Sequence, residues 1–269
     1  MSVWLWLPLA TAALTLFAVA LVRLPPTPSA IAVNLVALAV LTGAMLAGGW
    51  FEVSKMTAIV ATAEAVVVFR STGLGNSTGF RWLVLGGLVV NILIFVGLEA
   101  SIRGVTLNVL AGSLILATLS GPGAFAVSED LQRRLSYDLS LAWVLAYSTW
   151  DVNFFFFIKD MDTGERTGTL AALGVAQALA SLLACGFRAK DYLAGRMFVM
   201  LGIGVLVVVV PFEPWLVRSP GWRIPAVEQA LHALALGLTL AALVQSILRA
   251  RRGELPRNLV ERALAVGRS

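Results

Sequence analysis

The sequence predicts an all-α, polytopic membrane protein with about nine transmembrane helices. Of its 269 residues, 59% are hydrophobic and 13% are charged, and its mean hydropathy is +0.88. Soluble domains average about 45 to 50% apolar and about 25% charged residues, so both values indicate a membrane protein. Apolar stretches of bilayer-spanning length follow one another along the chain with short connections between them, so no soluble domain is expected.

The predicted helices follow apolar stretches of about 17 to 25 residues, the length that matches the hydrocarbon core. They cover residues 3–22, 30–50, 56–69, 82–100, 105–127, 137–158, 169–187, 197–212 and 226–248. The third stretch is short, contains Glu64 and lies between Lys55 and Arg70. We therefore expect the third helix to be short or broken, as a short span, a half-helix or a re-entrant segment.

The positive charges orient the predicted bundle. No basic residue precedes the first helix and Arg23 follows it, which favours an N-terminus outside the membrane. We expect this first stretch to be a retained helix, because it lacks the basic region that begins a cleaved signal peptide. An outside start and an inside end require an odd number of crossings, which nine helices satisfy.

The end of the chain is basic. It contains six of the 20 basic residues: Arg249, Arg251, Arg252, Arg257, Arg262 and Arg268. We therefore expect residues 1–248 to form the transmembrane bundle and residues 249–269 a cytoplasmic tail. Pro256 suits a first helical position, so the tail forms either an amphipathic helix on the membrane surface or a frayed basic end.

Composition excludes several kinds of site and partner. The single Cys185 excludes an internal disulfide or a thiolate metal cluster, and the single His232 excludes a two-histidine haem or a multi-histidine zinc site. The three lysines lie near segment ends, so no retinal site is expected. The net charge of +5 is concentrated in the tail, which indicates a membrane flank rather than a nucleic-acid-binding surface.

Asp151 is the leading candidate for a binding site, because it lies well inside the sixth predicted helix. An acidic residue at the centre of a membrane helix costs about 2.5 to 3.5 kcal/mol on insertion scales, so it normally faces other helices or a solvated cavity. Tyr147 lies one turn before Asp151 and Asn153 lies two residues after it. We predict that Asp151 binds a proton or a substrate and that Tyr147 and Asn153 orient it. The alternative is a carboxyl that is simply protonated or paired with a neighbouring helix.

Other polar residues extend this hypothesis. Glu64 is a second buried acid and could line the same cavity, or it could form a structural ion pair. Asn91 and Asn108 lie inside the fourth and fifth helices, where amides usually bond neighbouring helices. Asn91 is included among the candidate substrate-binding residues.

Acidic residues also collect at the outer ends of the predicted helices. Glu99, Glu228 and His232 are candidates for an outer vestibule, where negative charge would concentrate cations. His232 lies one turn after Glu228 and could relay protons. The alternative is that the positive-inside bias alone leaves the outside acidic.

A longer pattern involves the sixth helix. Tyr147-Ser148-Thr149-Trp150-Asp151 is followed by phenylalanines at 154–157, with Asn91 and Glu99 upstream and Phe187-Arg188-Ala189 downstream. Over predicted helices 3 to 8 this resembles an uncharacterised family of bacterial multi-span membrane proteins, although Asp151 stands where that family has asparagine. The family has no assigned activity, so the resemblance implies only the membrane fold.

These observations favour a transporter or channel for a small solute or cation, with or without proton coupling, that uses buried carboxylates. A non-catalytic subunit of a larger membrane complex is the alternative, and a lipid- or isoprenoid-modifying enzyme is a third hypothesis. The expected partners are the lipid bilayer, a small solute or cation, and a second copy or a membrane-complex subunit. The preference for Arg over Lys and for Ala, Val and Leu is typical of a GC-rich bacterium. The expected location is the bacterial cytoplasmic membrane.

Overall fold

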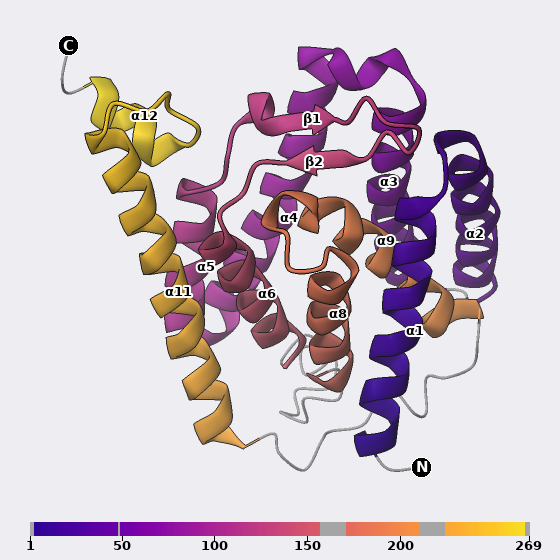
Figure 1. Ribbon diagram of the computed structural model, residues 1–269. Helices are drawn as coiled ribbons and strands as arrows, with labels where there is room; N and C mark the ends of the chain where they lie inside the picture. The colour runs from indigo at the N-terminus through magenta and orange to yellow at the C-terminus, as the bar shows by residue number, and fades with distance from the viewer. Residues whose placement is uncertain (1–2, 48, 157–170, 210–223, 267–269) are drawn as a thin grey trace. The chain divides into compact units, whose positions relative to one another are not determined.

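The computed structural model describes residues 3–47, 49–156, 171–209 and 224–266 (Figure 1). The chain divides into two compact units, each built from three segments. Unit 1 comprises Met1–Phe80, Phe125–Tyr137 and Val175–Arg218, and unit 2 comprises Arg81–Ala124, Asp138–Gly174 and Ser219–Ser269. The two units therefore alternate along the sequence.

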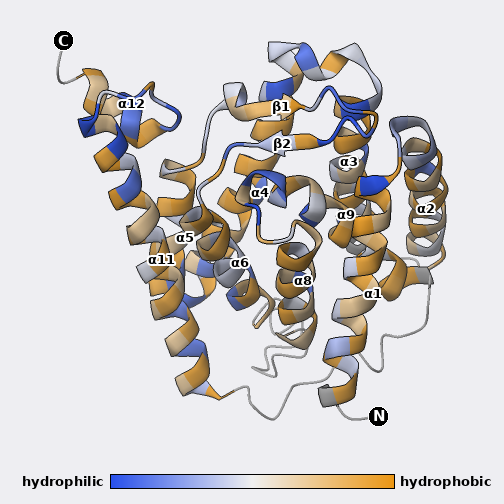
Figure 2. Ribbon diagram, in the orientation of Figure 1, coloured by the Kyte–Doolittle hydropathy of each residue, from blue (hydrophilic) through white to orange (hydrophobic). Residues whose placement is uncertain are grey.

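Helices dominate the described residues. Five helical segments are long and apolar enough to cross a membrane: α1 (Val3–Arg23), α2 (Pro26–Ala47), α4 (Thr78–Arg103), Ala189–Val208 with α9 (Tyr192–Gly204) at its centre, and α11 (Pro225–Arg251). Figure 2 shows hydrophobic residues along most of α1, α2 and α11. Large apolar side chains such as Leu16 (70% exposed) and Leu46 (83%) face outward, as in a protein surrounded by lipid. The chain is consistent with an integral membrane protein.

Unit 1 contains α1, α2, α9 and α3 (Trp50–Ser71). α3 is a continuous helix of 22 residues, so the expectation of a short or broken third helix is wrong. Its charged residues do not interrupt it, because Glu, Lys and Arg are good helix formers. α2 packs against α3, and α9 packs against α1 and α3. A short π-helical stretch, η4 (Val205–Val209), follows α9.

The end of α1 is closed by the side chain of Arg70, which is 2% exposed and comes from the last turn of α3. Its guanidinium donates to the carbonyls of Leu21 (3.0 Å), Val22 (3.2 Å) and Leu24 (2.5 Å). The last carbonyls of a helix lack partners within it and carry partial negative charge, so a cation is favoured there. Arg70 also donates to the Ser29 hydroxyl at 3.0 Å and to the Gln132 carbonyl at 2.8 Å.

Replacing this cap should destabilise unit 1. Arg70→Lys has no planar fork with which to bind carbonyls from several segments, so we expect a loss of about 2 kcal/mol of unfolding free energy. Thermal unfolding in detergent measures it. Arg23→Lys, on an exposed arginine at the end of α1, is the matched control and should leave the melting temperature unchanged. Equal melting temperatures for both variants would contradict the capping role.

A small β-hairpin completes the described core of unit 1. β1 (Phe125–Val127) pairs with β2 (Leu135–Tyr137) in antiparallel register, with Phe125 opposite Tyr137. Phe125 stacks between Tyr137 and Phe69 of α3, with ring centroids 4.3 and 5.0 Å apart. In the connecting loop, the hydroxyl of Ser128 and the guanidinium of Arg134 bind Asp130 and hold the pKa of its carboxyl below its ordinary value.

Two predicted helix bounds are wrong around this hairpin. Residues 118–127 were expected in a helix, but α5 ends at Ala117, and a 3₁₀ turn (η2, Pro122–Ala124) and β1 follow. The Ser120-Gly121-Pro122-Gly123 sequence explains this end, because proline removes a backbone donor and glycine disfavours a helix. Likewise, α6 begins only at Leu141, after Ser140 has capped it.

Unit 2 is built from α4, α5 (Leu107–Ala117), α6 (Leu141–Phe155), α11 and α12 (Leu259–Val266). α5 and α6 pack against each other, and both pack against α11. With 11 and 15 residues they are about 16 and 22 Å long, less than the roughly 30 Å hydrocarbon core. Neither helix is therefore long enough to cross that core by itself.

α5 and α6 approach closely at Gly112. A methyl group at this position would lie 2.5 Å from Val96 Cγ2 and 2.7 Å from Trp150 Nε1. Both distances are shorter than real carbon contacts, and Trp150 is 1% exposed, so the indole has little room to move. Gly112 therefore permits the contact that holds Trp150 of α6 against α5.

We expect Gly112→Ala to lower the stability of the protein by about 1 to 3 kcal/mol, the usual cost of overpacking a core. Gly97→Ala on α4 is the control, because nothing lies within 4 Å of its added methyl group. Thermal unfolding followed by tryptophan fluorescence should separate the two variants. Similar unfolding curves would show that α5 and α6 are not closely packed there.

Candidate functional site

α6 contains the principal predicted site residues, and all three are buried. Tyr147 and Asp151 are each 2% exposed, and Asn153 is fully buried. Residues four apart share a helix face, whereas residues two apart point about 200° apart. Tyr147 therefore lies on the face of Asp151, but Asn153 points elsewhere. Its amide donates to the Asn108 side chain of α5 at 2.8 Å, so its hydrogen bond runs to α5.

The contact between Asn153 and Asn108 belongs to a longer polar chain in unit 2. Asn108 Nδ2 donates to Glu99 Oε2 at 2.7 Å, and the Thr106 hydroxyl donates to Glu99 Oε1 at 2.7 Å. Glu99 is 1% exposed and Asn108 is fully buried. The chain therefore links a carboxylate of α4, an amide of α5 and an amide of α6 inside the unit.

Local sequence explains why the carboxylate lies there. α4 ends at Arg103, Gly104 turns the chain with a φ of +74°, and Thr106 caps α5 by accepting a hydrogen bond from Val109 N at 3.1 Å. Glu99 in the last turn of α4 thereby faces the first turn of α5. The unpaired N–H groups and the dipole at a helix N-terminus stabilise a negative charge.

A second charged group lies in the same unit. Arg103 of α4 pairs with Glu228 in the first turn of α11, with side chains 12% and 18% exposed. His232, one turn further along α11, is 8% exposed, and the charges of Glu99, Glu228 and Arg103 all act on its ring. Glu99 and His232 are thus enclosed in unit 2 rather than placed on an open surface.

Three buried polar atoms of unit 2 have no hydrogen-bond partner among the described residues. They are Asn153 Oδ1, Trp150 Nε1 and His232 Nε2. Buried polar atoms normally have partners, and exceptions occur at catalytic or binding sites and where water binds. Asn153 Oδ1 is an acceptor at the end of the Glu99 chain, and Trp150 Nε1 is a donor one turn earlier on α6. Trp150 Nε1 is packed against Gly112 of α5, so Asn153 Oδ1 is the atom of this pair that could accept a hydrogen bond from a small polar species.

An aromatic ladder follows α6 away from this chain. Trp143, Tyr147 and Trp150 stack in sequence, with ring centroids 5.1 and 5.9 Å apart. The indole of Trp143 donates to the Ile115 carbonyl of α5 at 3.0 Å, which holds the first ring in place. The ladder fills the side of α6 between its first turn and Asn153.

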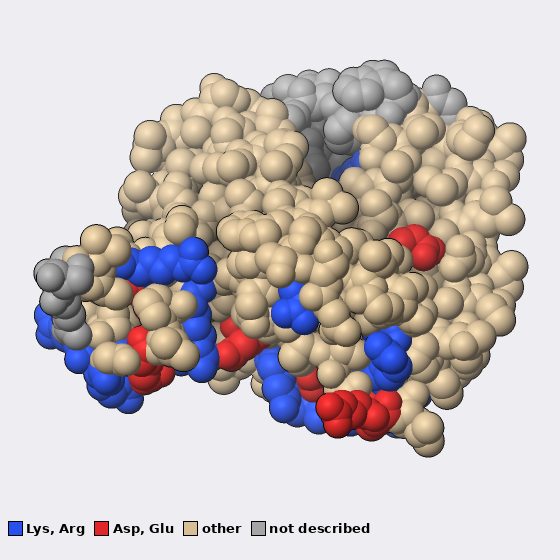
Figure 3. All heavy atoms as spheres, turned by 90° about the horizontal axis from the view of Figure 1, so that it is seen from above, with Lys and Arg blue, Asp and Glu red and all other residues tan. Residues whose placement is uncertain are grey.

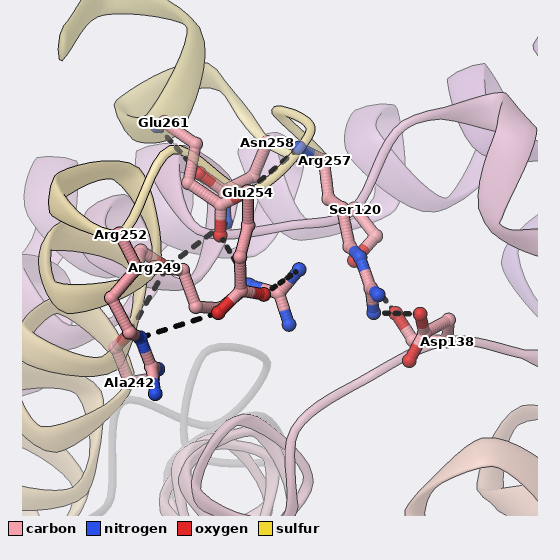
Figure 4. Close-up of polar contacts among 10 residues, drawn as sticks. Ser120, Asp138, Ala242, Arg249, Arg252, Glu254, Arg257, Asn258 and Glu261 are labelled. Atoms are coloured by element: carbon pink, nitrogen blue, oxygen red, sulfur yellow. Dashed lines mark hydrogen bonds and ion pairs between the residues drawn. The ribbon is translucent and has the colours of Figure 1, made fainter. Parts of the chain in front are cut away.

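A polar pocket of about 160 Å³ lies at the other end of the ladder, and Trp143 contributes to its wall. It is formed by the end of α5, the start of α6, the last turns of α11 and the C-terminal segment, which we define as Gly253–Val266. Its charged residues are paired. Arg257 faces Asp138, and the Glu261 carboxylate lies 3.3 Å from Arg249 Nε (Figure 4).

The remaining predicted site residues lie apart from the Glu99 chain. Asn91 is exposed on α4, about two turns before Glu99 of that helix. Glu64 lies on α3 in unit 1, and its buried Oε1 has no hydrogen-bond partner among the described residues. Within the described ranges, no three His, Cys, Asp or Glu residues cluster as a metal site would require.

Sequence reasoning missed the role of Thr106 and assigned Asn108 only to interhelical bonding. The signal was present, because Gly104 followed by Thr106 marks the end of one helix and the cap of the next. Asn108 then lies in the first turn of α5, where its side chain faces the end of α4. Neither the family models, nor the curated proteins, nor the solved structures contain a match to this chain.

The polar chain makes a direct prediction for Asn108. Asn108→Ala leaves Glu99 Oε2 and Asn153 Nδ2 without partners, so unfolding free energy should fall by about 1 to 3 kcal/mol. Asn91→Ala removes an exposed amide from α4 and should change stability little. Thermal unfolding of the two purified variants measures the difference. An Asn108→Ala protein as stable as Asn91→Ala would show that the chain contributes nothing to folding.

Proposed function

We propose that the protein is a proton-coupled transporter of a small polar solute or cation in a bacterial cytoplasmic membrane, and that Glu99 is its proton site. One observation carries the proposal. Glu99 is 1% exposed and its carboxylate is bound by a hydroxyl and an amide, with no ion pair to it among the described residues. Acidic residues kept inside membrane helices despite their cost commonly mark ion or proton pathways.

The hydrogen bonds of Glu99 connect its protonation to helix packing. An ionised carboxylate accepts from both Thr106 and Asn108. A protonated carboxyl carries a donor on one oxygen, so it can no longer accept equally on both sides. Protonation therefore weakens one of these bonds. If Asn108 moves as a result, its hydrogen bond with Asn153 of α6 changes too. This is a physical route from a proton to the relative position of two short helices.

His232 and Glu228 supply a path for that proton. The ring of His232 lies within electrostatic reach of both carboxylates, and its Nε2 has no partner among the described residues. Histidine exchanges protons near neutral pH more readily than other side chains. Arg103 pairs with Glu228, so a cation lies beside the second carboxylate of this path.

The pocket at the other end of α6 gives the solute a second polar location in unit 2. Between the pocket and the Glu99 chain lies the aromatic ladder of Trp143, Tyr147 and Trp150. Stacked rings exclude water, so they separate the two polar regions in this conformation. A transporter requires such a barrier, because its site opens to one side of the membrane at a time.

Asp151 and Glu64 remain candidates for a second charge site. Asp151 is as deeply buried as Tyr147, beside which it lies on α6. Glu64 has a buried carboxylate oxygen without a hydrogen-bond partner in the described part of α3. Comparing the transport of Asp151→Asn and Glu64→Gln with that of Glu99→Gln assigns the order of importance.

The proposal predicts that Glu99→Gln removes proton coupling. In vesicles that contain the purified protein, a panel of amino acids, amines and monovalent cations is applied and the charge movement is recorded on a solid-supported membrane. We expect currents that depend on the pH gradient in the wild type, and a loss of about tenfold or more in Glu99→Gln, equivalent to about 1.4 kcal/mol. Glu129→Gln, on an exposed hairpin residue, is the control.

Infrared difference spectroscopy gives a test that does not need the solute. A pH jump should produce a protonated-carboxyl band in the wild type that is absent from Glu99→Gln and present in Glu129→Gln. If the Glu99→Gln variant gave currents as large as those of the wild type and kept the carboxyl band, Glu99 would have no part in the mechanism. Currents lost in Asp151→Asn alone would transfer the proton site to α6.

A further inference from the structure

The C-terminal segment has an unusual distribution of polar and apolar side chains. Its polar residues face the protein: Asn258 is 6% exposed and Glu261 is 2% exposed. Its apolar residues face outward: Leu255 is 86% exposed, Leu259 65% and Val266 75%. A helix on the surface of a water-soluble protein has the reverse arrangement, with its apolar side buried. The exposed side of this segment therefore suits an apolar environment.

This orientation is fixed by hydrogen bonds. Asn258 caps α12 by accepting from Glu261 N at 3.0 Å, and its amide donates to the Ser246 hydroxyl of α11 at 2.9 Å. Glu261 in turn accepts from Arg257 N at 2.7 Å and pairs with Arg249 of α11. The Arg257 carbonyl accepts from Gly121 N at 2.7 Å. Because these contacts hold the polar side inward, the leucines cannot turn into the protein.

Basic residues surround the exposed leucines. Residues 249–266 contain five arginines and two glutamates. Four of the arginines are exposed: Arg251, Arg252, Arg257 and Arg262. Arg252 pairs with Glu254 and Arg257 with Asp138, so the segment keeps an excess of positive charge after its ion pairs are made. Figure 3 shows basic side chains gathered over this end of the chain.

The length of α11 fixes the depth of the segment. α11 has 27 residues and is about 40 Å long, which exceeds the roughly 30 Å hydrocarbon core by several residues. Its last turn contains Arg249 and Arg251, residues that favour the headgroup region. Gly253, with a φ of +73°, then turns the chain immediately into the C-terminal segment. The segment therefore begins at the level of the lipid headgroups.

We propose that the C-terminal segment binds the anionic headgroup layer of the surrounding bilayer, with Leu255, Leu259 and Val266 inserted between acyl chains and the exposed arginines paired with lipid phosphates. Apolar side chains beside basic residues are the combination by which interfacial helices bind anionic lipid. The partner is the membrane surface itself. The segment fastens the end of α11 and the wall of the polar pocket to that surface.

Depth-dependent quenching tests this proposal on the full-length protein. The only cysteine, Cys185, is replaced by serine, and Leu259→Cys is labelled with a fluorophore in lipid nanodiscs. One set of discs contains phosphatidylcholine alone and the other contains phosphatidylcholine with phosphatidylglycerol, each with brominated acyl chains as quenchers. We expect strong quenching by brominated lipid in the anionic discs and clearly less in the neutral discs. Label at Leu240→Cys, an exposed position within α11, is the control for a lipid-facing site.

A charge variant separates the two parts of the proposal. Arg262 is exposed, and no acidic partner pairs with it in the described part of the chain, so Arg262→Gln should reduce quenching in the anionic discs only. Arg23→Gln at the end of α1 is the matched control and should leave it unchanged. Equal quenching in both kinds of disc would overturn the assignment to anionic lipid. Quenching at Leu259→Cys by aqueous iodide alone, or by neither quencher, would show water or a second protein copy on this surface and reject the proposal.

Discussion

The guanidinium of Arg70 closes the end of α1, and unit 1 is assembled around that contact. The carbonyls that it binds come from the last turn of α1 and the turn before α2, and one more comes from the hairpin loop. In a medium without water, each of these groups needs a partner within the protein. In unit 2 the charge and the helix end are reversed. The carboxylate of Glu99 lies against the N-terminus of α5 and accepts from the side chains of Thr106 and Asn108. Each unit thus matches a buried charge to the helix end of opposite polarity.

The two buried charges differ in what surrounds them. Five oxygen atoms accept from Arg70, so its donors are saturated and its role is structural. The chain that begins at Glu99 ends at Asn153 Oδ1, which lacks a partner among the described residues. Buried polar networks that are only partly satisfied cost stability, and an unpartnered atom within one is explained by bound water or an ion, by strain, or by a role in chemistry. This contrast supports a functional role for Glu99 and a structural role for Arg70.

Hydropathy identified the long helices because each contains a stretch of 18 residues that is strongly apolar on average and has at most two charged residues. Hydropathy predicted a single helix over 105–127, which is also apolar, but α5 ends at Ala117. The turn-forming sequence Ser120-Gly121-Pro122-Gly123 ends the helical region there. Hydropathy also placed Glu99 at an outer helix end. Its burial depends on α5 returning beside α4, which is a tertiary contact. Asn153 was assigned to Asp151 by proximity in sequence, although helical geometry alone separates their directions.

The alternation of the two units along the chain bears on how the protein is made. Unit 1 needs a segment that begins at Val175, and unit 2 needs Ser219–Ser269. While α1 emerges from the ribosome, neither Arg70 nor Gln132, which complete its end, has been synthesised. The first helices are therefore made before several of their partners in unit 1 exist. The surfaces of α1 and α3 that α9 covers therefore stay uncovered until the residues after Val175 have been made.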